Sequence, residues 1–379
     1  MKHIVYLTSE YPKKGLNGGG IGSFVQFLSR NLLKKGIKVS VIGINSNFDT
    51  VIENDNEITI YRLARSRWKL AKFYDHTNRI LKKINELDKE VTVDIVEGSE
   101  LNFSFFPKNT SYKKVIRLHG GHHFFAIELN KTPTLWRGYQ ERQSFRKADH
   151  YIAVSNYVGS QTQKYLKFNF DYKTIYNSVD TDKFSMSKPE NIKKNTLLFV
   201  GTVCEKKGIR QLVQAMQLIQ EEVPTIKLKI VGRDWKDKAG NSFTTYLKTY
   251  VNEELKEAIE FVGPVTHTEV SSYIEKAQIC VFPSHVESFG LVLLEALIMG
   301  KVVLASNIEP FKEIKGKEHI FEFINEISPE NISKKIIGLL NSNNETQKMG
   351  ELARENTFKR FNEETITIKN IQYYNLILS

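Results

Sequence analysis

Short apolar runs alternate with amphipathic segments along most of the chain. A first series of such runs is expected to form strands at residues 3–8, 38–44, 94–97, 115–119 and 151–154. Residues 24–35 repeat apolar side chains at helical spacing, so a helix is expected directly after the first strand. Alternation of this kind predicts parallel sheets that are covered by helices.

A second series of the same kind begins near Thr196, with a helix expected at 208–219. Its expected strands lie at residues 197–200, 227–231, 258–262, 279–282 and 301–305. The polar segment 185–195 contains a proline and is the expected linker. We therefore predict an α/β protein with a Rossmann-like domain at 1–185 and a second one at 186–361. A helix at about 362–379 is expected to pack back on the first domain.

The net charge of +11 lies entirely within residues 1–185. Local basic concentrations occur at 62–69, at Lys82-Lys83 and at Lys113-Lys114. A basic face of this kind can dock on anionic lipid head groups or attract a phosphorylated acceptor, and it can equally be ordinary solvated surface. No helix-turn-helix, zinc-finger or aromatic RNA-reading signature accompanies the charge, so nucleic acid is not an expected partner.

The chain contains no apolar stretch near the roughly 18–20 residues that span a bilayer. Its first apolar run is too short, and turns polar too soon, for a secretion signal. Cys204 and Cys280 lie in strand-like or turn segments and are expected to be reduced thiols. We therefore expect a cytoplasmic protein, and the basic first half leaves open a location at the inner face of the cell membrane.

One carboxylate lies in an otherwise apolar helix. Residues 291–299 are apolar except for Glu295, and a helix that is apolar all round is a buried helix. An isolated buried carboxylate would cost several kcal/mol, so something polar should meet Glu295. A ribose diol is one candidate, because a carboxylate can accept hydrogen bonds from two hydroxyls. A buried arginine or lysine is the alternative partner.

A second carboxylate, Glu287, lies in the turn before that helix. The backbone amides of Phe289, Gly290 and Leu291 are expected at the helix N-terminus, where unpaired donors and the helix dipole stabilise an anion. The pattern predicts a diphosphate at the helix start, a ribose at Glu295 and a sugar at Glu287.

Three further segments follow expected strands. Residues 199–208 carry a glycine near each end, and Lys207 is placed to reach a phosphate. The glycine turn at 18–22 lacks the spacing of the dinucleotide fingerprint, but it allows a close backbone approach to a diphosphate. The segment 117–123 holds three histidines; two are adjacent and no carboxylate or cysteine stands at ligand spacing, so no metal site is expected.

Together these motifs resemble the retaining glycosyltransferases of family 4, which have the GT-B fold of two Rossmann-like domains facing an interdomain cleft. The resemblance extends over nearly the whole chain, and its most specific part is the pair Glu287 and Glu295, with seven residues between them, preceded by Pro283-Ser284. The other matching segments are Gly19-Gly20, His119, 148–155, 175–180 with Phe184, 199–208, Val231-Gly232 and 261–263.

The resemblance implies transfer from a UDP- or GDP-sugar with retained anomeric configuration, without a metal or other cofactor. It places the ribose at Glu295 and the donor sugar at Glu287, and it places the leaving diphosphate at Lys207 and the helix-start amides. Gly20, with Gly19 beside it, would approach the same phosphates from the other domain. His119 would lie over the donor sugar, and the backbone around Val262 would meet the base.

One position departs from the family pattern. The family usually has arginine after the glycine equivalent to Gly201, and here that residue is Thr202. Lys207 then remains as the main cation of the diphosphate clamp, unless Arg233 or Arg210 substitutes. Ser288, where glycine is commoner, is a smaller departure.

Two other functions stay open on the sequence alone. One is a UDP-sugar epimerase of the same fold, and the other is a catalytically silent subunit that binds a sugar nucleotide. For a transferase, the basic first half favours a glycan or lipid-linked acceptor, as in the synthesis of a surface polysaccharide or lipopolysaccharide.

Overall fold

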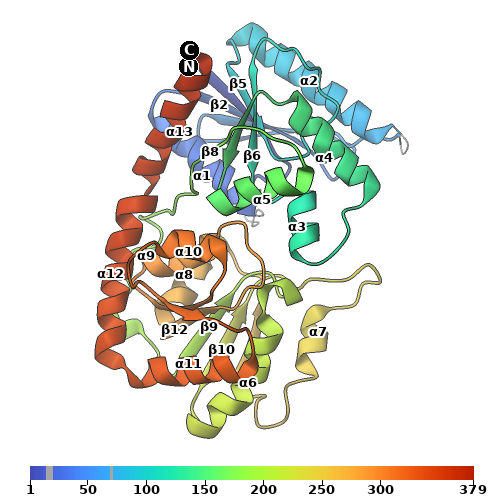
Figure 1. The fold of residues 1–379 in the computed structure, drawn as a ribbon. Coiled ribbons are helices and arrows are strands. Elements are labelled where there is room, and N and C mark those ends of the chain that lie inside the picture. The colour runs from blue at the N-terminus through green and yellow to red at the C-terminus, as the bar shows by residue number, and fades with distance from the viewer. Residues whose placement is uncertain (14–19, 69–70) are drawn as a thin grey trace. The chain divides into compact units, whose positions relative to one another are not determined.

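The computed structural model describes residues 1–13, 20–68 and 71–379, and it divides into two compact units (Figure 1). The first unit comprises Met1–Ser178 and Glu363–Ser379, and the second comprises Val179–Asn362. The boundary predicted after residue 185 therefore lies within the second unit. The segment that begins at Val179 belongs there because its backbone amide donates to the carbonyl oxygen of Phe361 at 3.0 Å.

The first unit is built on a sheet with the strand order β3-β4-β2-β1-β5-β6-β7-β8. All neighbouring strands are parallel except β3 and β4, which form an antiparallel hairpin at the edge. The strands are β1 (His3–Leu7), β2 (Lys38–Ile44), β3 (Val51–Asp55), β4 (Ile58–Leu63), β5 (Ile95–Gly98), β6 (Lys113–Leu118), β7 (His150–Ala153) and β8 (Lys173–Thr174).

Helices connect and cover these strands (Figure 1). They are α1 (Gly20–Lys34), α2 (Lys72–Glu90), α3 (His122–Glu128), α4 (Leu135–Lys147), α5 (Asn156–Leu166) and α13 (Glu363–Leu378). The apolar stripe predicted on α1 is real, because Phe24, Leu28 and Leu32 are buried in the core beside β1 and β2.

A buried polar network attaches α13 to the first sheet. Arg117 donates to Glu97 at 2.7 Å and to the side-chain oxygen of Asn370 at 2.6 Å. The hydroxyl of Tyr374 also donates to Glu97, at 2.7 Å. A buried ion pair needs such additional hydrogen bonds to offset its desolvation. The C-terminal helix is thus fixed to this unit by specific polar contacts as well as by its apolar side.

The second unit is built on an all-parallel sheet with the order β11-β10-β9-β12-β13-β14. Its strands are β9 (Thr196–Val200), β10 (Lys227–Val231), β11 (Ile259–Gly263), β12 (Ile279–Phe282), β13 (Val302–Ser306) and β14 (Glu322–Ile324). Its helices are α6 (Ile209–Glu222), α7 (Phe243–Lys248), α8 (His267–Lys276), α9 (Leu291–Ile298), α10 (Glu309–Lys315), α11 (Pro329–Asn341) and α12 (Asn343–Phe361).

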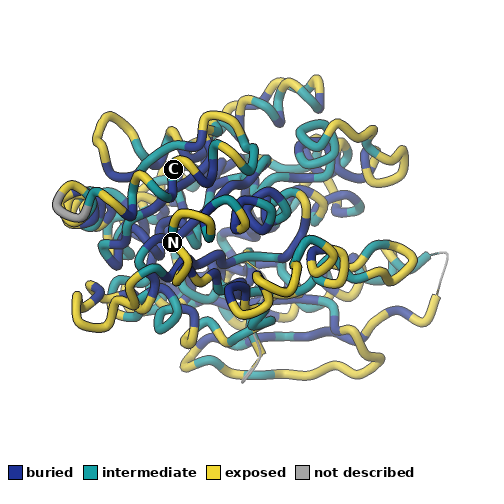
Figure 2. Tube along the Cα trace, turned by 90° about the horizontal axis from the view of Figure 1, so that it is seen from below, coloured by how far each residue is buried: buried dark blue, intermediate teal, exposed yellow. Residues whose placement is uncertain are grey.

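Central strands such as β1, β9 and β12 are buried along their whole length, and the exposed stretches are mainly loops and outer helix faces (Figure 2). Burial on both faces explains why these strands appear in the sequence as continuous apolar runs. None of the helices in the described part of the chain has the length and apolar composition needed to cross a bilayer.

Each sheet has one strand at which the order of building reverses. In the second unit the chain adds β10 and β11 on one side of β9 and then places β12 on its other side. In open parallel sheets, ligands bind outside the carboxyl ends of the strands at such a point. The loops that follow β9 and β12 are therefore the candidate ligand-binding loops of the second unit.

Candidate functional site

The loops after β9 and β12 are held against one another at the carboxyl edge of the second sheet. The amide of His285 donates to the carbonyl oxygen of Lys206 at 2.9 Å. Gly208 has a positive φ of 66°, and a Cβ there would lie 1.8 Å from the carbonyl oxygen of Pro283. Only glycine permits this approach. The glycine after the Lys206-Lys207 turn thus sets the distance between the two loops.

This approach brings Lys207 and Glu287 together as an ion pair. The hydroxyl of Ser284 donates to the same carboxylate at 3.0 Å. The side chains of Lys207 and Glu287 are 22% and 13% exposed, so the pair is partly shielded from water. Burial acts to raise the pKa of Glu287, but the charges of Lys207 and Lys206 outweigh it and hold that pKa below its usual value. Glu287 is therefore an ionised hydrogen-bond acceptor at neutral pH.

Helix α9 begins at Leu291, a few residues after Glu287, and Gly290 is its N-cap. Gly290 has a positive φ of 115°, and a Cβ there would lie 2.6 Å from the ring of Phe311. The first amides of a helix have no acceptor within the helix. The amides at the α9 N-terminus, together with Lys207, form a positive end that can hold an anion.

Glu295 lies on α9 and is 6% exposed, as its apolar surroundings in the sequence predicted. Its partner in the described part of the chain is His267, whose Nε2 lies 2.8 Å from Oε1 of Glu295. Among the described residues, no arginine or lysine forms an ion pair with Glu295, although Nζ of Lys183 lies 2.7 Å from Nδ1 of His267. Glu295 therefore has a polar partner, as its apolar surroundings predicted, but that partner is a histidine that no pattern in the sequence identified.

The loop after β10 also joins this edge. The amide of Val203, which follows Thr202, donates to the carbonyl oxygen of Arg233 at 2.9 Å. Arg210 instead donates to Glu205 through Nε and Nη2 and to Gln214 through Nη1, so it is already engaged. Of the two arginines considered as substitutes for the missing clamp residue, Arg233 is the exposed one without an ion pair in the described regions.

The structure does not place every predicted donor residue beside the Lys207–Glu287 pair. Val262 lies in β11, and β10 separates that strand from β9. Gly19 falls outside the described residues. Gly20 and His119 belong to the first unit, where Gly20 opens α1 and His119 follows β6.

His119 is held from two sides within the first unit. Its amide donates to Glu100 at 2.6 Å, and its ring lies 5.5 Å from that of Phe24. Burial and the neighbouring Arg117 charge lower the pKa of His119 to about 3. Its imidazole is consequently neutral at physiological pH. Burial raises the pKa of Glu100 to about 8 despite backbone donors to its carboxylate, and the charge of Glu141 adds to the rise.

The two neighbouring histidines have other partners. Nδ1 of His123 contacts Glu141, and Nε2 of His122 accepts from the amide of Thr134 at 2.9 Å. In the regions that the structure describes, no group of three or more histidine, cysteine, aspartate or glutamate side chains is arranged to hold a metal ion.

Part of the basic face expected from the sequence is not surface. Arg62 is buried in β4, where it pairs with Glu53 and donates to backbone carbonyls. Lys114 is also buried and lies 3.2 Å from Asp149. Residues such as Arg65 and Lys113 remain exposed. A basic residue on a strand can thus be buried even when it belongs to a basic stretch of the sequence. The sequence alone does not show which of these side chains point into the fold.

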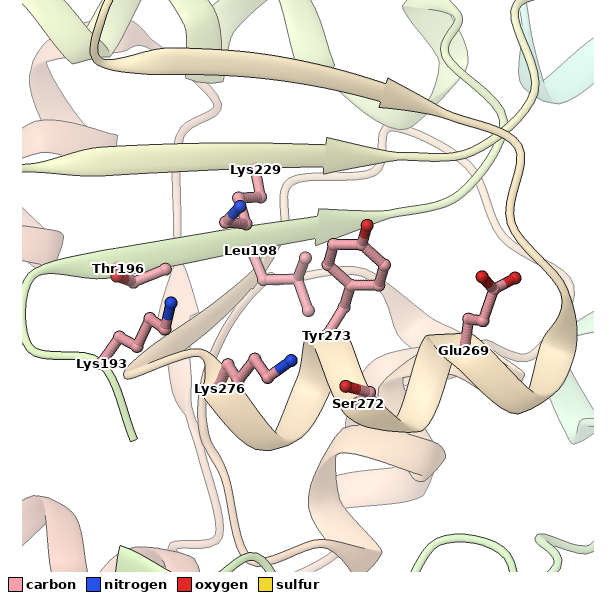
Figure 3. Close-up of a pocket in the computed structure, with 8 residues that line it drawn as sticks. All are labelled: Lys193, Thr196, Leu198, Lys229, Glu269, Ser272, Tyr273 and Lys276. Carbon is pink, nitrogen blue, oxygen red and sulfur yellow. The ribbon is translucent and has the colours of Figure 1, made fainter. Parts of the chain in front are cut away.

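A cavity of about 300 Å³ lies elsewhere in the second unit (Figure 3). It opens beside β9, β10 and α8, and none of the predicted donor residues lines it. Its wall consists of Lys193, Thr196, Leu198, Lys229, Glu269, Ser272, Tyr273 and Lys276. The predicted donor chemistry and this cavity are therefore separate features of the unit.

Sequence reasoning missed three side chains that contact the predicted carboxylates or their partners: His267, Lys183 and Ser284 were assigned no role. Ser284 was named only as part of the family motif. The signal for His267 was indirect, since a lone buried carboxylate requires a donor, but no local pattern shows which loop supplies it.

Two protein-family models match consecutive parts of the chain. The model for glycosyltransferase family 4 matches residues 18–183, and the model for glycosyl transferases group 1 matches residues 180–356. An uncharacterized glycosyltransferase of Haemophilus influenzae is 26% identical over 283 residues, which cover 74% of each chain. N-acetyl-alpha-D-glucosaminyl L-malate synthase of Bacillus anthracis is 26% identical over 233 residues, 59% of each chain.

Several solved structures have folds that can be superposed on this chain over almost its full length. Sucrose-phosphate synthase from Thermosynechococcus elongatus has a TM-score of 0.83 at 18% identity and covers 100% of this chain and 99% of its own. Anabaena HepE in complex with UDP-glucose has a TM-score of 0.77 at 14% identity, covering 99% and 100%. WaaG, a glycosyltransferase involved in lipopolysaccharide biosynthesis, has a TM-score of 0.71 at 16% identity, covering 96% and 98%.

At these identities the structural similarity concerns the fold, which is that of GT-B glycosyltransferases. The family models add the activity class, and together they span residues 18–356. The chain therefore belongs to the group 1 glycosyltransferases of family 4, enzymes with the GT-B fold.

Proposed function

We propose that this glycosyltransferase takes a nucleotide diphosphate sugar, a UDP-sugar in preference to a GDP-sugar, and transfers the sugar with retained configuration and without a metal. The observation that carries the proposal is the Lys207–Glu287 pair beside the N-terminus of α9, at the point where the strand order of the second sheet reverses. The complex of HepE with UDP-glucose supports the choice of donor class.

The proposed chemistry follows from the charges at this edge. As the bond to the diphosphate breaks, negative charge grows on the leaving oxygen. Lys207 and the first amides of α9 are fixed donors that stabilise this charge without reorganisation. Ionised Glu287 would accept hydrogen bonds from the hydroxyls of the donor sugar. Glu295, with one oxygen bound to His267, would accept from the ribose with the other.

Thr202 makes the proposed clamp weaker than that of its family. A threonine hydroxyl offers one neutral hydrogen bond, where an arginine would offer charge-assisted ones. The ion pair with Glu287 also holds Lys207 until a diphosphate competes for it. The roles that the family resemblance implies for Gly20, His119 and Val262 remain predictions.

Thermal shift with UDP- and GDP-sugars tests the donor. Ligand at about 100 times its dissociation constant should stabilise the native state by about 2.7 kcal/mol. We expect UDP-sugars to stabilise the wild type, and Glu295→Ala to lose most of that shift. Stabilisation by GDP-sugars alone would overturn the preference for uridine. Absence of any shift would count against the whole proposed site.

Turnover separates the transferase from the two other functions. With acceptor absent, an epimerase would convert one UDP-sugar into another, whereas a transferase would not. A silent subunit would bind the donor and turn over nothing with any acceptor. For a transferase, proton NMR of the product should show the anomeric configuration of the donor, and an inverted product would contradict the proposed retention.

We further propose a glycan or lipid-linked acceptor and a cytoplasmic protein in contact with an anionic membrane surface. An exposed aromatic patch in the first unit supports this contact. It consists of the exposed rings of Phe73, Trp136 and Tyr139, the half-buried ring of Phe105, and Leu135, which is 93% exposed. Each of these rings has its centroid within 6.5 Å of that of a neighbouring ring. Two cations belong to the same helix starts: Arg137 is exposed, and Lys72 is half-buried with its ammonium 4.8 Å from the centroid of the Phe73 ring. Aromatic rings flanked by cations suit an anionic lipid interface.

Vesicle sedimentation tests the membrane contact. We expect the wild type to bind vesicles that contain anionic lipid and to bind neutral ones much less. Trp136→Glu should abolish the binding, while Leu376→Glu, at an exposed leucine of α13, should leave it intact. Equal binding to neutral and anionic vesicles would show that the positive charge does not drive the membrane contact. Full binding by Trp136→Glu would show that the aromatic patch is not the contact surface.

A further inference from the structure

His267 and Lys183 form a hydrogen-bonded chain that ends at Glu295. Lys183 precedes Phe184 in the first segment of the second unit, and His267 is the first residue of α8. Nζ of Lys183 lies 2.7 Å from Nδ1 of His267, and Nε2 of His267 lies 2.8 Å from Oε1 of Glu295. Three separate parts of the unit thus converge on one buried carboxylate.

The chemistry of the three groups fixes where the protons are. A lysine ammonium has donors only, so Nδ1 of His267 must accept from Lys183. The remaining ring proton then lies on Nε2, which donates to Glu295. The alternative tautomer would direct its Nδ1 proton at an ammonium and present a lone pair to a carboxylate. Lys183 therefore selects the one neutral form of His267 that can hold Glu295.

The ring of His267 is held in place independently of Glu295. The Phe184 ring meets it edge-on with centroids 5.3 Å apart. Thr266, the residue before it, caps α8 in a reciprocal pair with Glu269. A cap of this kind fixes the first residue of the helix. The donor that reaches Glu295 is consequently anchored by packing on one side and by helix capping on the other.

The contact leaves half of the carboxylate available. His267 binds Oε1, and in the described part of the chain no donor reaches Oε2 of Glu295. A neutral donor also leaves the negative charge on the carboxylate, so its acceptor strength is retained. A cation placed directly on Glu295 would compete for the same oxygens with an incoming hydroxyl. This arrangement suits a carboxylate that must be oriented and still accept hydrogen bonds from a ligand.

We propose that His267, with its tautomer set by Lys183, is a positioning residue that orients Glu295 toward the ribose hydroxyls of the donor. The proposal rests on the proposed function, because it assumes that Glu295 meets the ribose. It adds that recognition of the ribose depends on two residues outside the family motif. Lys183 contacts His267 and His267 contacts Glu295, so in this proposal both residues act through Glu295.

Discrimination between UDP and 2′-deoxy-UDP or 3′-deoxy-UDP tests this proposal by calorimetry. A hydrogen bond to a charged group is worth about 10-fold to 100-fold in affinity, so the wild type should prefer UDP over at least one deoxy form by that factor. We expect His267→Ala to reduce this preference to about 3-fold or less, with little change in affinity for that deoxy form. His267→Gln places an amide nitrogen near the position of Nε2 and should restore much of the preference.

Lys183→Met supplies a second variant that leaves the imidazole in place. It should lower the preference several-fold, because the ring can then carry its proton on Nδ1. The side chain of His267 is 40% exposed, so these substitutions should leave the fold intact, which melting curves without ligand verify.

The outcomes distinguish this proposal from the proposed function. If Glu295→Ala loses the preference for UDP while His267→Ala keeps it in full, the positioning role is wrong and the ribose site stands. If Glu295→Ala binds UDP with an undiminished preference, the ribose site itself is wrong and this proposal falls with it. A His267→Ala variant that weakens UDP and the deoxy forms equally would also overturn the positioning role, since that is the result of general damage.

Discussion

Replacement of Lys207 by methionine should destabilise the second unit as well as impair donor binding. The substitution keeps the aliphatic stem and removes the charge that faces Glu287. The carboxylate, 13% exposed, would then retain Ser284 as its remaining described side-chain donor. Loss of one partner from a fully buried pair costs about 3–5 kcal/mol. Because this pair is only partly buried, we expect a loss of about 2 kcal/mol in the free energy of unfolding, or about 4–8 °C in melting temperature.

The pH dependence of this loss identifies its cause. Lys207 and Lys206 hold the pKa of Glu287 below its usual value, so the pair contributes stability above the pKa of an unfolded glutamate. That contribution disappears as the pH falls through the lowered pKa of the folded state. The difference in melting temperature between wild type and Lys207→Met should therefore be largest near neutral pH and shrink in acid.

The same variant measures the proposed contact with the diphosphate. A charge-assisted hydrogen bond of about 1.5–3 kcal/mol corresponds to a loss of roughly 10-fold to 100-fold in affinity for UDP by calorimetry. Lys256→Met is the matched control, because Lys256 pairs with Glu253 at an exposed site. We expect the control to change neither quantity appreciably. A destabilisation of Lys207→Met that does not vary with pH would refute the role of Glu287, and unchanged affinity for UDP would refute the role of the cation.

Three further predictions concern single positions. Thr202→Arg should tighten UDP binding several-fold at low salt, with Thr202→Val as the neutral control, and an unchanged dissociation constant would show that no cation is missing. Arg117→Met should cost about 3–5 kcal/mol in chemical denaturation of the first unit, because Glu97 would be left buried without a cation; a loss below 1 kcal/mol would contradict this. Glu100, whose pKa burial raises to about 8, binds its proton more tightly in the folded state, so stability should fall as the pH rises from about 4.5 to 8, and Glu100→Gln should remove this slope in thermal melts.

The central strands could be predicted from the sequence because they are buried on both faces. The expected strands at 38–44, 227–231 and 279–282 coincide with β2, β10 and β12. The edge hairpin β3–β4 was not predicted, because Val51 and Ile52 of β3 are exposed and polar residues follow them. An edge strand with a solvated face gives no continuous apolar run, so the local pattern is weak there.

The candidate site could be predicted in part for a similar reason. Glu287, Glu295 and the glycine of the α9 start stand together in one segment, where a charge in an apolar helix is conspicuous. The residues that complete their environment come from distant segments. His267 follows β11 and Lys183 precedes β9, and only the packing of α8 against the rest of the unit brings them to Glu295. Contacts of this kind leave no local periodicity to detect.

The basic residues illustrate the opposite limit. The net charge of the first half is a property of composition, and it holds whatever the fold. The exposure of each cation depends on the strand or helix that carries it. Arg62 and Lys114 are buried, and the exposed aromatic patch at the starts of α2 and α4 was not predicted. The sequence thus indicates the sign of the net charge of the first half, but not which of its charged and aromatic side chains are exposed.

Hydrogen–deuterium exchange with and without UDP tests the central claim most directly, because it locates the donor site within the chain. We predict that UDP protects the backbone amides of two segments, residues 202–208 after β9 and residues 284–295 through α9. Protection that appears at the cavity beside α8, around Lys193 and Lys276, and spares both segments would contradict the account.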